Sequence, residues 1–281
     1  MTVLRLRLFH ALDGARIAYR EGGVGSPLVM WHSRGLSHRE FLPASSELLD
    51  RFRIGLADLP LHGDSEESRE FSYTADWVAG LLAEASREIG GPRPRVAASG
   101  LGAQLVLRAI GNGQLDPSAL VLLPSRLHRP ARNRATGTVA RGVARVSAPA
   151  SGLFSRGLVR ATVSAELVGS DVTPRVAELD RMSRRSLLES RDRGEGWRRA
   201  IAEWDGERFR DLIDVYNRVD CPTLVLWCPD HELAPLQAAE EAADLINGAL
   251  LRTLPGTGPL LAYDDPVGFA REIASFLRAP G

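Results

Sequence analysis

The sequence contains no lysine, so all 35 of its basic residues are arginine. Without a lysine amine, neither a Schiff-base mechanism nor a lysine general base is available. The 35 acidic residues balance the arginines, and the formal net charge at pH 7 is zero. No overall field therefore attracts nucleic acid or an anionic membrane. A hydrophobic fraction of 44% and a charged fraction of 25% are typical of a folded globular protein.

Cysteines and long apolar runs are also scarce. The two cysteines, Cys221 and Cys228, flank one expected strand, which would hold their Cα atoms roughly 23 Å apart and exclude a disulfide between them. Reduced cysteines and an N-terminus without the pattern of a signal peptide predict a cytoplasmic protein. No segment reaches the ~20 continuous apolar residues that span a bilayer, so no membrane partner is expected.

Signals for metal ions and nucleotide cofactors are missing as well. The six histidines show no ligand spacing with cysteines or paired carboxylates. The stretch GLGAQ lacks the third glycine of a dinucleotide-binding turn, and GVGSP precedes a strand rather than a helix. We therefore expect no metal, no cofactor and no nucleic-acid partner, and a small molecule as the substrate or ligand.

Apolar runs alternate with helix-like segments along the chain. Strands are expected at 4–9, 15–21, 27–32, 53–58, 95–99, 119–124, 221–228 and 249–255. Helices are expected at 39–52, 73–89, directly after Ser99, at 235–246 and at about 265–278. The first two strands read as a hairpin around Asp13-Gly14. This alternation predicts an α/β protein with a mainly parallel, doubly wound sheet.

The alternation is interrupted in the middle of the chain. Residues 125–219 contain helical and Gly/Ala/Ser-rich sequence but no convincing buried strand. We interpret them as a helical cap inserted between two parts of one core, 1–124 and 220–281. Within the cap, residues 126–160 carry eight arginines and no acidic residue. This run is either a cationic lid for an anionic substrate or carrier, or a solvated helix face.

Five motifs occur in a distinctive order: WHSRG (31–35), DLPLHGDSE (58–66), ASGLGA (98–103), CPTLVLWCPDHELAP (221–235) and LPGTGPLLAYDDP (254–266). They resemble, in turn, the oxyanion loop, the Asp-x-x-Gly-x-Gly-x-Ser turn, the nucleophile elbow, the catalytic-acid loop and the catalytic-histidine segment of the α/β-hydrolase superfamily. In the second motif Leu61 replaces the first glycine. The resemblance implies an α/β-hydrolase fold with a ligand site over the elbow.

The elbow segment allows two registers. With Ser99 at the tip, Ala97 and Leu101 take the two flanking positions that must be small, and leucine is bulky there. With Gly100 at the tip, Ala98 and Gly102 flank it, and both are small. The second register is favoured and places no nucleophile at the tip. A hydrolase that uses Ser99 remains the alternative.

The other two triad positions also depart from the family pattern. Pro259 stands where the catalytic histidine is expected, and no histidine follows residue 231. Counting without gaps puts His231 at the position of the catalytic acid, with Asp230 one residue away. The resemblance therefore implies a degenerate member without the Ser-His-Asp triad.

Candidate site residues follow from these motif positions. His231, His32 and Arg34 are the candidate catalytic groups, because imidazoles exchange protons near neutral pH and a guanidinium binds a carboxylate or an enolate. The candidate substrate-binding residues are Ser33, Ser99, Gly100, Leu101, Asp230 and Pro259. His32 instead ties its loop to the backbone in the alternative interpretation, and His231 is then a surface histidine.

Three further polar residues in the motifs are interpreted as structural. Asp58 and His62 are expected to fix the turn that follows the fourth strand. Asp264 is expected to cap the last helix.

Two classes of function remain open. The favoured one is a non-hydrolytic, cofactor-independent enzyme of lyase, isomerase or cyclase type, as in natural-product biosynthesis. It would act on a largely apolar small metabolite through shape and one or two acid–base groups. The other is a non-catalytic pseudo-hydrolase that serves as a small-molecule receptor or a partner-binding protein.

Overall fold

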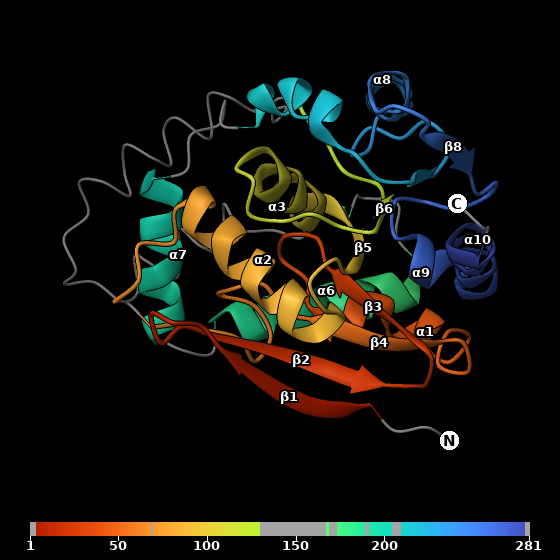
Figure 1. Ribbon diagram of the computed structural model, residues 1–281. Helices are drawn as coiled ribbons and strands as arrows, with labels where there is room; N and C mark the ends of the chain where they lie inside the picture. The colour runs from red at the N-terminus through yellow and green to blue at the C-terminus, as the bar shows by residue number, and fades with distance from the viewer. Residues whose placement is uncertain are drawn as a thin grey trace.

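The computed structural model describes residues 4–68, 70–129, 167–168, 173–188, 191–203 and 209–278. Its centre is an eight-stranded sheet of order β1-β2-β4-β3-β5-β6-β7-β8 (Figure 1). The strands are β1 (Arg5–His10), β2 (Arg16–Gly22), β3 (Ser26–Trp31), β4 (Phe52–Ala57), β5 (Arg95–Ala98), β6 (Ala119–Leu122), β7 (Thr223–Trp227) and β8 (Leu250–Thr253). The predicted fold class, an α/β-hydrolase fold, is confirmed.

The N-terminal hairpin forms as the sequence predicts. β1 pairs with β2 in antiparallel register from Arg5 opposite Glu21 to His10 opposite Arg16. Gly14 in the turn has φ +87°, and the Asp13 carboxylate accepts a hydrogen bond from the backbone N–H of Ala15 at 2.9 Å. β2 is also antiparallel to β4, whereas the ladders from β4 through β3 to β8 are parallel.

Helices cover the sheet in two groups. α2 (Ala75–Gly90) and α3 (Gly100–Gly111) pack side by side, and α8 (Leu236–Leu245) contacts β7 and β8. The second group is α1 (Leu42–Ser45), α9 (Leu261–Asp264) and α10 (Pro266–Arg278), which contact one another (Figure 1). No helix in the described ranges is long and apolar enough to cross a bilayer.

The helix predicted at 39–52 is wrong in its extent. The segment contains a short 3-10 helix, η1 (His38–Phe41), the four-residue α1, and then turns as far as β4. The Ser45 hydroxyl donates to the carbonyl of Leu42 at 2.8 Å. Such a local side-chain bond to the backbone competes with helix propagation, and Ser46 follows directly.

The described elements between β6 and β7 are helical. They are α6 (Pro174–Leu188), α7 (Arg191–Glu203), and the 3-10 helices η2 (Arg210–Asp214) and η3 (Tyr216–Arg218). η2 and η3 contact α3, and their buried side chains belong to the main core. The end of the predicted 125–219 cap therefore packs with the core. The arginine-rich run lies outside the described residues beyond Arg129.

α3 approaches the end of β3 closely enough that one of its positions must be glycine. A Cβ on Gly102 would lie 2.7 Å from the carbonyl oxygen of His32 and 2.8 Å from that of Trp31. Both neighbours are backbone atoms, so a side chain displaces either the helix or the loop after β3. The small pair Gly102-Ala103 of the elbow motif thus sets the distance between helix and strand.

We expect Gly102→Ala to lower the free energy of unfolding by about 2 kcal/mol, because the added methyl overpacks a backbone contact. Gly194→Ala in α7 is the matched control: apart from its own helix and chain neighbours, no heavy atom of the described residues lies within 4 Å of its added Cβ. In the control, the higher helix propensity of alanine raises stability by about 0.5 to 1 kcal/mol. Urea denaturation measures both variants, and equal stabilities would contradict the close approach.

Candidate functional site

The tip of the elbow between β5 and α3 is a glycine. Ser99 has extended backbone (φ −118°, ψ 148°), whereas Gly100 has φ +50°, in the left-handed region. The turn therefore reverses at Gly100, as in the favoured register. The Gly100 N–H donates to the carbonyl of Pro124 at 3.0 Å, which holds the turn against the end of β6.

The serine hydroxyl beside the tip is directed into the protein. Ser99 is 1% exposed, and its Oγ lies 3.5 Å from the carbonyl oxygen of Pro124. On the other side of the tip, Leu101 is buried and lines a cavity of about 10 Å³ with His62 and Trp197. Such a cavity has room for about one water molecule. Ser99 and Leu101 thus pack against the core.

The residues at the other two triad positions lie on loops after β7 and β8. His231 is half-buried, and its Nδ1 accepts a hydrogen bond from the N–H of Leu233 at 3.1 Å. Asp230 is exposed and caps the start of α8, accepting from the N–H of Leu236 at 3.1 Å. Pro259 is buried. Of these three residues, His231 alone carries an imidazole ring. Nε2 is the ring nitrogen that this hydrogen bond leaves available.

The predicted helix cap at Asp264 is wrong by one residue. The carboxylate of Asp264 accepts from the N–H of Gly258 at 2.8 Å and so closes the loop after β8. Asp265 Oδ1 instead accepts from the N–H of Gly268 at 2.9 Å, in the first turn of α10. The absence of a side chain at Gly268 permits this close approach, since a Cβ there would overlap the Asp265 carboxylate.

Both ring nitrogens of His32 are bonded to backbone. Nδ1 lies 2.7 Å from the carbonyl oxygen of Ser33, and Nε2 accepts from the N–H of Leu59 at 2.9 Å. Burial lowers the pKa of His32 to about 4, so the ring is neutral at pH 7. The geometry matches the alternative interpretation, in which His32 ties its loop to the backbone.

The remaining predicted residues after β3 are part of a packed loop. The N–H and the hydroxyl of Ser33 both donate to Glu40 Oε2 at 2.8 Å. Arg34 is half-buried. Further along, Leu36 packs in an apolar cluster with Leu179 of α6 and with Leu260, which follows Pro259. The loops after β3 and β8 therefore meet under the cap through leucine side chains.

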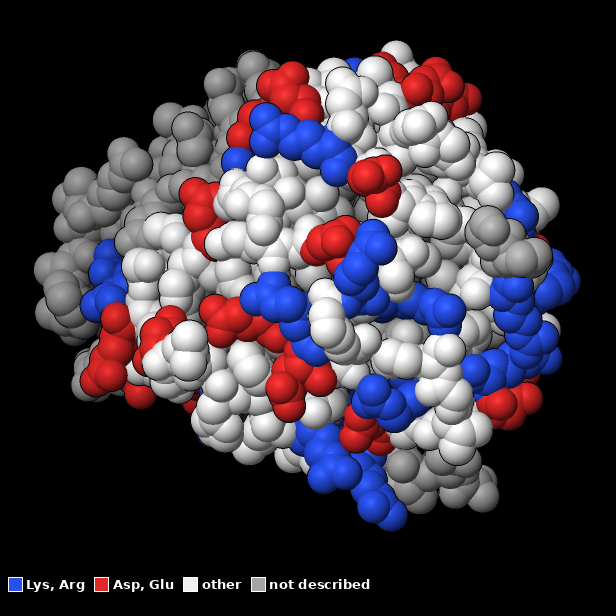
Figure 2. All heavy atoms as spheres, viewed as in Figure 1, with Lys and Arg blue, Asp and Glu red and all other residues white. Residues whose placement is uncertain are grey.

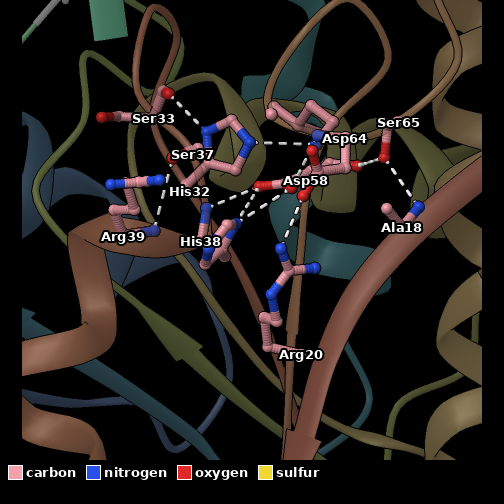
Figure 3. Close-up of polar contacts among 12 residues, drawn as sticks. Ala18, Arg20, His32, Ser33, Ser37, His38, Arg39, Asp58, Asp64 and Ser65 are labelled. Atoms are coloured by element: carbon pink, nitrogen blue, oxygen red, sulfur yellow. Dashed lines mark hydrogen bonds and ion pairs between the residues drawn. The ribbon is translucent and has the colours of Figure 1, made fainter. Parts of the chain in front are cut away.

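A buried histidine–carboxylate pair lies beside this loop (Figure 3). His38 Nδ1 is 2.9 Å from Oδ1 and 3.0 Å from Oδ2 of Asp58, and the backbone N–H of His38 donates to Oδ1 at 2.6 Å. The N–H of Asp64 donates to Oδ2 at 3.1 Å. Burial alone would raise the pKa of the Asp58 carboxyl, but bonding to His38 outweighs it and lowers the pKa to about 2.

The turn after β4 is shaped around the Asp58 carboxylate. Gly63 has φ +51°, and a Cβ there would lie 2.1 Å from Asp58 Oδ2. Leu61, which replaces the family glycine, also has a positive φ of +66°. Its side chain reaches α7, where a Cβ on Gly196 would lie 2.4 Å from Leu61 Cδ2. The strained backbone of Leu61 thus lies where its side chain joins the core to the cap.

His38 opens onto a pocket of about 520 Å³ between the core and the cap. The start of β2, the loops after β3 and β4, and helices α6 and α7 line it, with polar side chains that include Arg16, Ser37, His38, Arg39, Ser183 and Arg193. The predicted site residues are not among those that line this pocket. In the part of the chain that the structure describes, no group of three or more metal-binding side chains is close enough to hold an ion.

Sequence reasoning interpreted Asp58 as a loop-fixing residue and missed His38. The available signal was a third histidine, six residues after His32, in the same motif loop as WHSRG. Nothing in the spacing shows that this ring meets Asp58, because the pairing joins residues twenty positions apart through a turn.

Comparisons with known proteins agree with the observed fold. A family model described as the alpha/beta hydrolase family matches residues 28–272. The thermophilic esterase from Thermogutta terrifontis superposes with a TM-score of 0.76 at 21% identity, covering 98% of each chain. The enol-lactonase from Burkholderia xenovorans LB400 gives 0.72 at 17% identity, over 96% of this chain and 99% of that one.

A sequence relative extends the comparison to uncharacterized proteins. One protein of Mycobacterium tuberculosis (strain H37Rv) is 22% identical over 290 residues, which cover 96% of this chain and 80% of the relative. Identities below 25% to the solved structures establish the fold alone.

The buried histidines make stability depend on pH. The unfolded chain protonates His32 near pH 6.5, whereas the folded protein does so only near pH 4. The unfolded state therefore binds more protons in this range, and the free energy of unfolding falls as the pH falls, by about 3 kcal/mol for His32 alone. Burial lowers the pKa of His62 as well, which adds to the loss.

Urea denaturation at several pH values between 7 and 4 measures this slope. We expect His32→Gln to have a shallower slope than the unmodified protein. His10→Gln, at an exposed position, controls for the loss of a histidine. A slope that His32→Gln leaves unchanged would contradict a neutral, backbone-bonded His32.

Proposed function

The chain belongs to the alpha/beta hydrolase family, and we propose that it is a cofactor-independent acid–base enzyme that works without an elbow nucleophile. The observation that carries the proposal is the left-handed Gly100 at the tip of the elbow. Acyl transfer in this fold requires a side-chain nucleophile at that tip. Glycine supplies none.

The neighbouring positions support a role other than triad hydrolysis. Pro259 has neither a titratable group nor a backbone donor, so it does not activate a nucleophile. Ser99 lies beside the tip with its hydroxyl near the carbonyl of Pro124, and the base position offers it no partner. The named structural neighbours include an esterase and an enol-lactonase, and the proposal gives this chain their fold with a different chemistry.

The pair formed by His38 and Asp58 supports acid–base chemistry. The Asp58 carboxylate accepts from Nδ1–H of His38, which fixes the tautomer of the ring. The lone pair of a neutral His38 is then on Nε2, at the opposite edge of the ring. A buried carboxylate in this position also stabilises the imidazolium that forms when Nε2 takes a proton. His38 lines the pocket, which would give a substrate access to that nitrogen.

The acid–base role thus falls to His38 and not to His32 or His231, the histidines expected from the sequence. His32 has both nitrogens bonded to backbone, so a substrate proton reaches neither without breaking the loop. His231 keeps only Nε2 available, and no carboxylate of the described residues bonds to its ring. We assign the reaction to the lyase or isomerase type, in which His38 removes a proton from carbon next to a carbonyl group and returns it elsewhere.

The proposal predicts that the protein does not react as a serine hydrolase. A fluorophosphonate probe should leave it unlabelled under conditions that label a serine esterase in the same gel, and p-nitrophenyl esters should be hydrolysed at the uncatalysed rate. Labelling that disappears in Ser99→Ala would instead establish Ser99 as a nucleophile and overturn the proposal.

Proton transfer is measured directly by hydrogen–deuterium exchange. A panel of small carbonyl compounds, neutral and charged, is incubated in D₂O and followed by proton NMR. We expect the protein to accelerate exchange next to the carbonyl for at least one compound, and His38→Gln to reduce that rate by 10²-fold or more. His231→Gln is the matched control and should retain the rate.

Two outcomes would contradict the assignment. Exchange lost in His231→Gln and kept in His38→Gln would return the chemistry to the loop after β7. No acceleration for any compound in the panel would favour the non-catalytic receptor, which retains a pocket but transfers no proton.

A further inference from the structure

We propose that the pocket beside His38 binds a small anion, so that the substrate carries a carboxylate or a phosphate group. For catalysis this rests on the proposed function, because it names the substrate class of the same site. Binding itself is separate from proton transfer and is measured separately.

Arginine is in excess on the pocket wall. Four arginines line it (Arg16, Arg39, Arg185 and Arg193), against two acidic residues. Both acids are already paired: Asp64 with Arg20 at 2.6 Å, and Glu67 with Arg193 at 2.7 Å. The acids of the wall therefore leave Arg16 and Arg39 to be considered separately. The face drawn in Figure 2 differs, since blue and red side chains are intermixed across it.

Arg39 and Arg16 contribute charge that the described acids do not neutralise. Within the described ranges neither forms an ion pair, and the Arg39 guanidinium donates one weak hydrogen bond, to Met182 Sδ at 3.5 Å. Nε of Arg16 is buried without a hydrogen-bond partner in that same part of the chain. Two guanidinium groups with donors to spare favour a planar or tetrahedral oxyanion.

A buried serine adds an independent sign of a ligand. Ser183 of α6 is 6% exposed and lines the pocket, and its Oγ has no hydrogen-bond partner among the described residues. Buried hydroxyls in folded proteins are nearly always paired. A rotation of the Ser183 side chain would turn this hydroxyl toward the pocket, where an oxyanion that contacts the arginines accepts from it.

The position of the pocket connects binding with the acid–base pair. His38 is on its wall together with Arg39, the next residue, while Ser183 belongs to the cap. A volume of about 520 Å³ fits a metabolite of ordinary size. A molecule whose anionic group is held by the arginines and Ser183 thus has its remaining atoms near Nε2 of His38. In the proton transfer, the C–H bond breaks, an N–H bond forms at His38, and the electron pair enters an enolate.

Isothermal titration calorimetry with inorganic phosphate and with malonate tests the proposal. We expect saturable binding of at least one, no binding of the neutral analogue malonamide, and a Kd about tenfold weaker in Arg39→Gln and Arg16→Gln. Arg39 is exposed, so its variant folds normally. Arg93→Gln, whose side chain pairs with Asp116 on the surface, is the matched control and keeps the Kd of the unmodified protein.

The two anions distinguish the source of the charge, because a preference for phosphate indicates a phosphorylated substrate and a preference for malonate a carboxylic acid. Binding of neither, or binding that both pocket variants leave unchanged, overturns the proposal. His38→Gln separates the anion site from the proposed function. If this variant binds the anion within threefold of the unmodified protein and also keeps the exchange rate, the anion site stands and His38 is not the base.

Discussion

The buried carboxylate of Asp58 is the interaction on which the site depends. It accepts hydrogen bonds from two backbone N–H groups and from the His38 ring, and so joins the loop after β3 to the turn after β4. Ser65 extends the connection, because its hydroxyl donates to the carbonyl of Asp58 and accepts from the N–H of Ala18 in β2 (Figure 3). An ionised, fully buried group persists only with such a set of partners.

The elbow and the polar pocket occupy separate places in this fold. The elbow keeps its shape, with a left-handed Gly100 and the close approach of Gly102, since both are needed to pack α3 against the sheet. The leucine cluster around Leu36 joins the cap to the loops after β3 and β8. The polar pocket lies to one side, where Asp58 orients His38 and the cap contributes Ser183. The packed elbow and the polar pocket are thus distinct parts of one fold.

The sequence predicted the features that depend on local pattern. The hairpin at Asp13-Gly14, the buried parallel strands and the register of the elbow follow from turn residues, apolar runs and residue size. The helix expected at 39–52 was too long, because periodicity does not reveal the bond from the Ser45 hydroxyl to the carbonyl of Leu42. The His38–Asp58 pair and the buried Ser183, which has no hydrogen-bond partner among the described residues, were missed for another reason. Each is defined by segments that only tertiary packing brings together.

The central claim is that ligands meet the protein at His38, and NMR of ¹⁵N-labelled histidine side chains tests it most directly. With Nδ1 bonded to Asp58, the account predicts that adding malonate or phosphate shifts the Nε2 resonance of His38 and leaves those of His231 and His32 unchanged. A shift confined to His231, with the His38 signal unaffected at saturation, would contradict it.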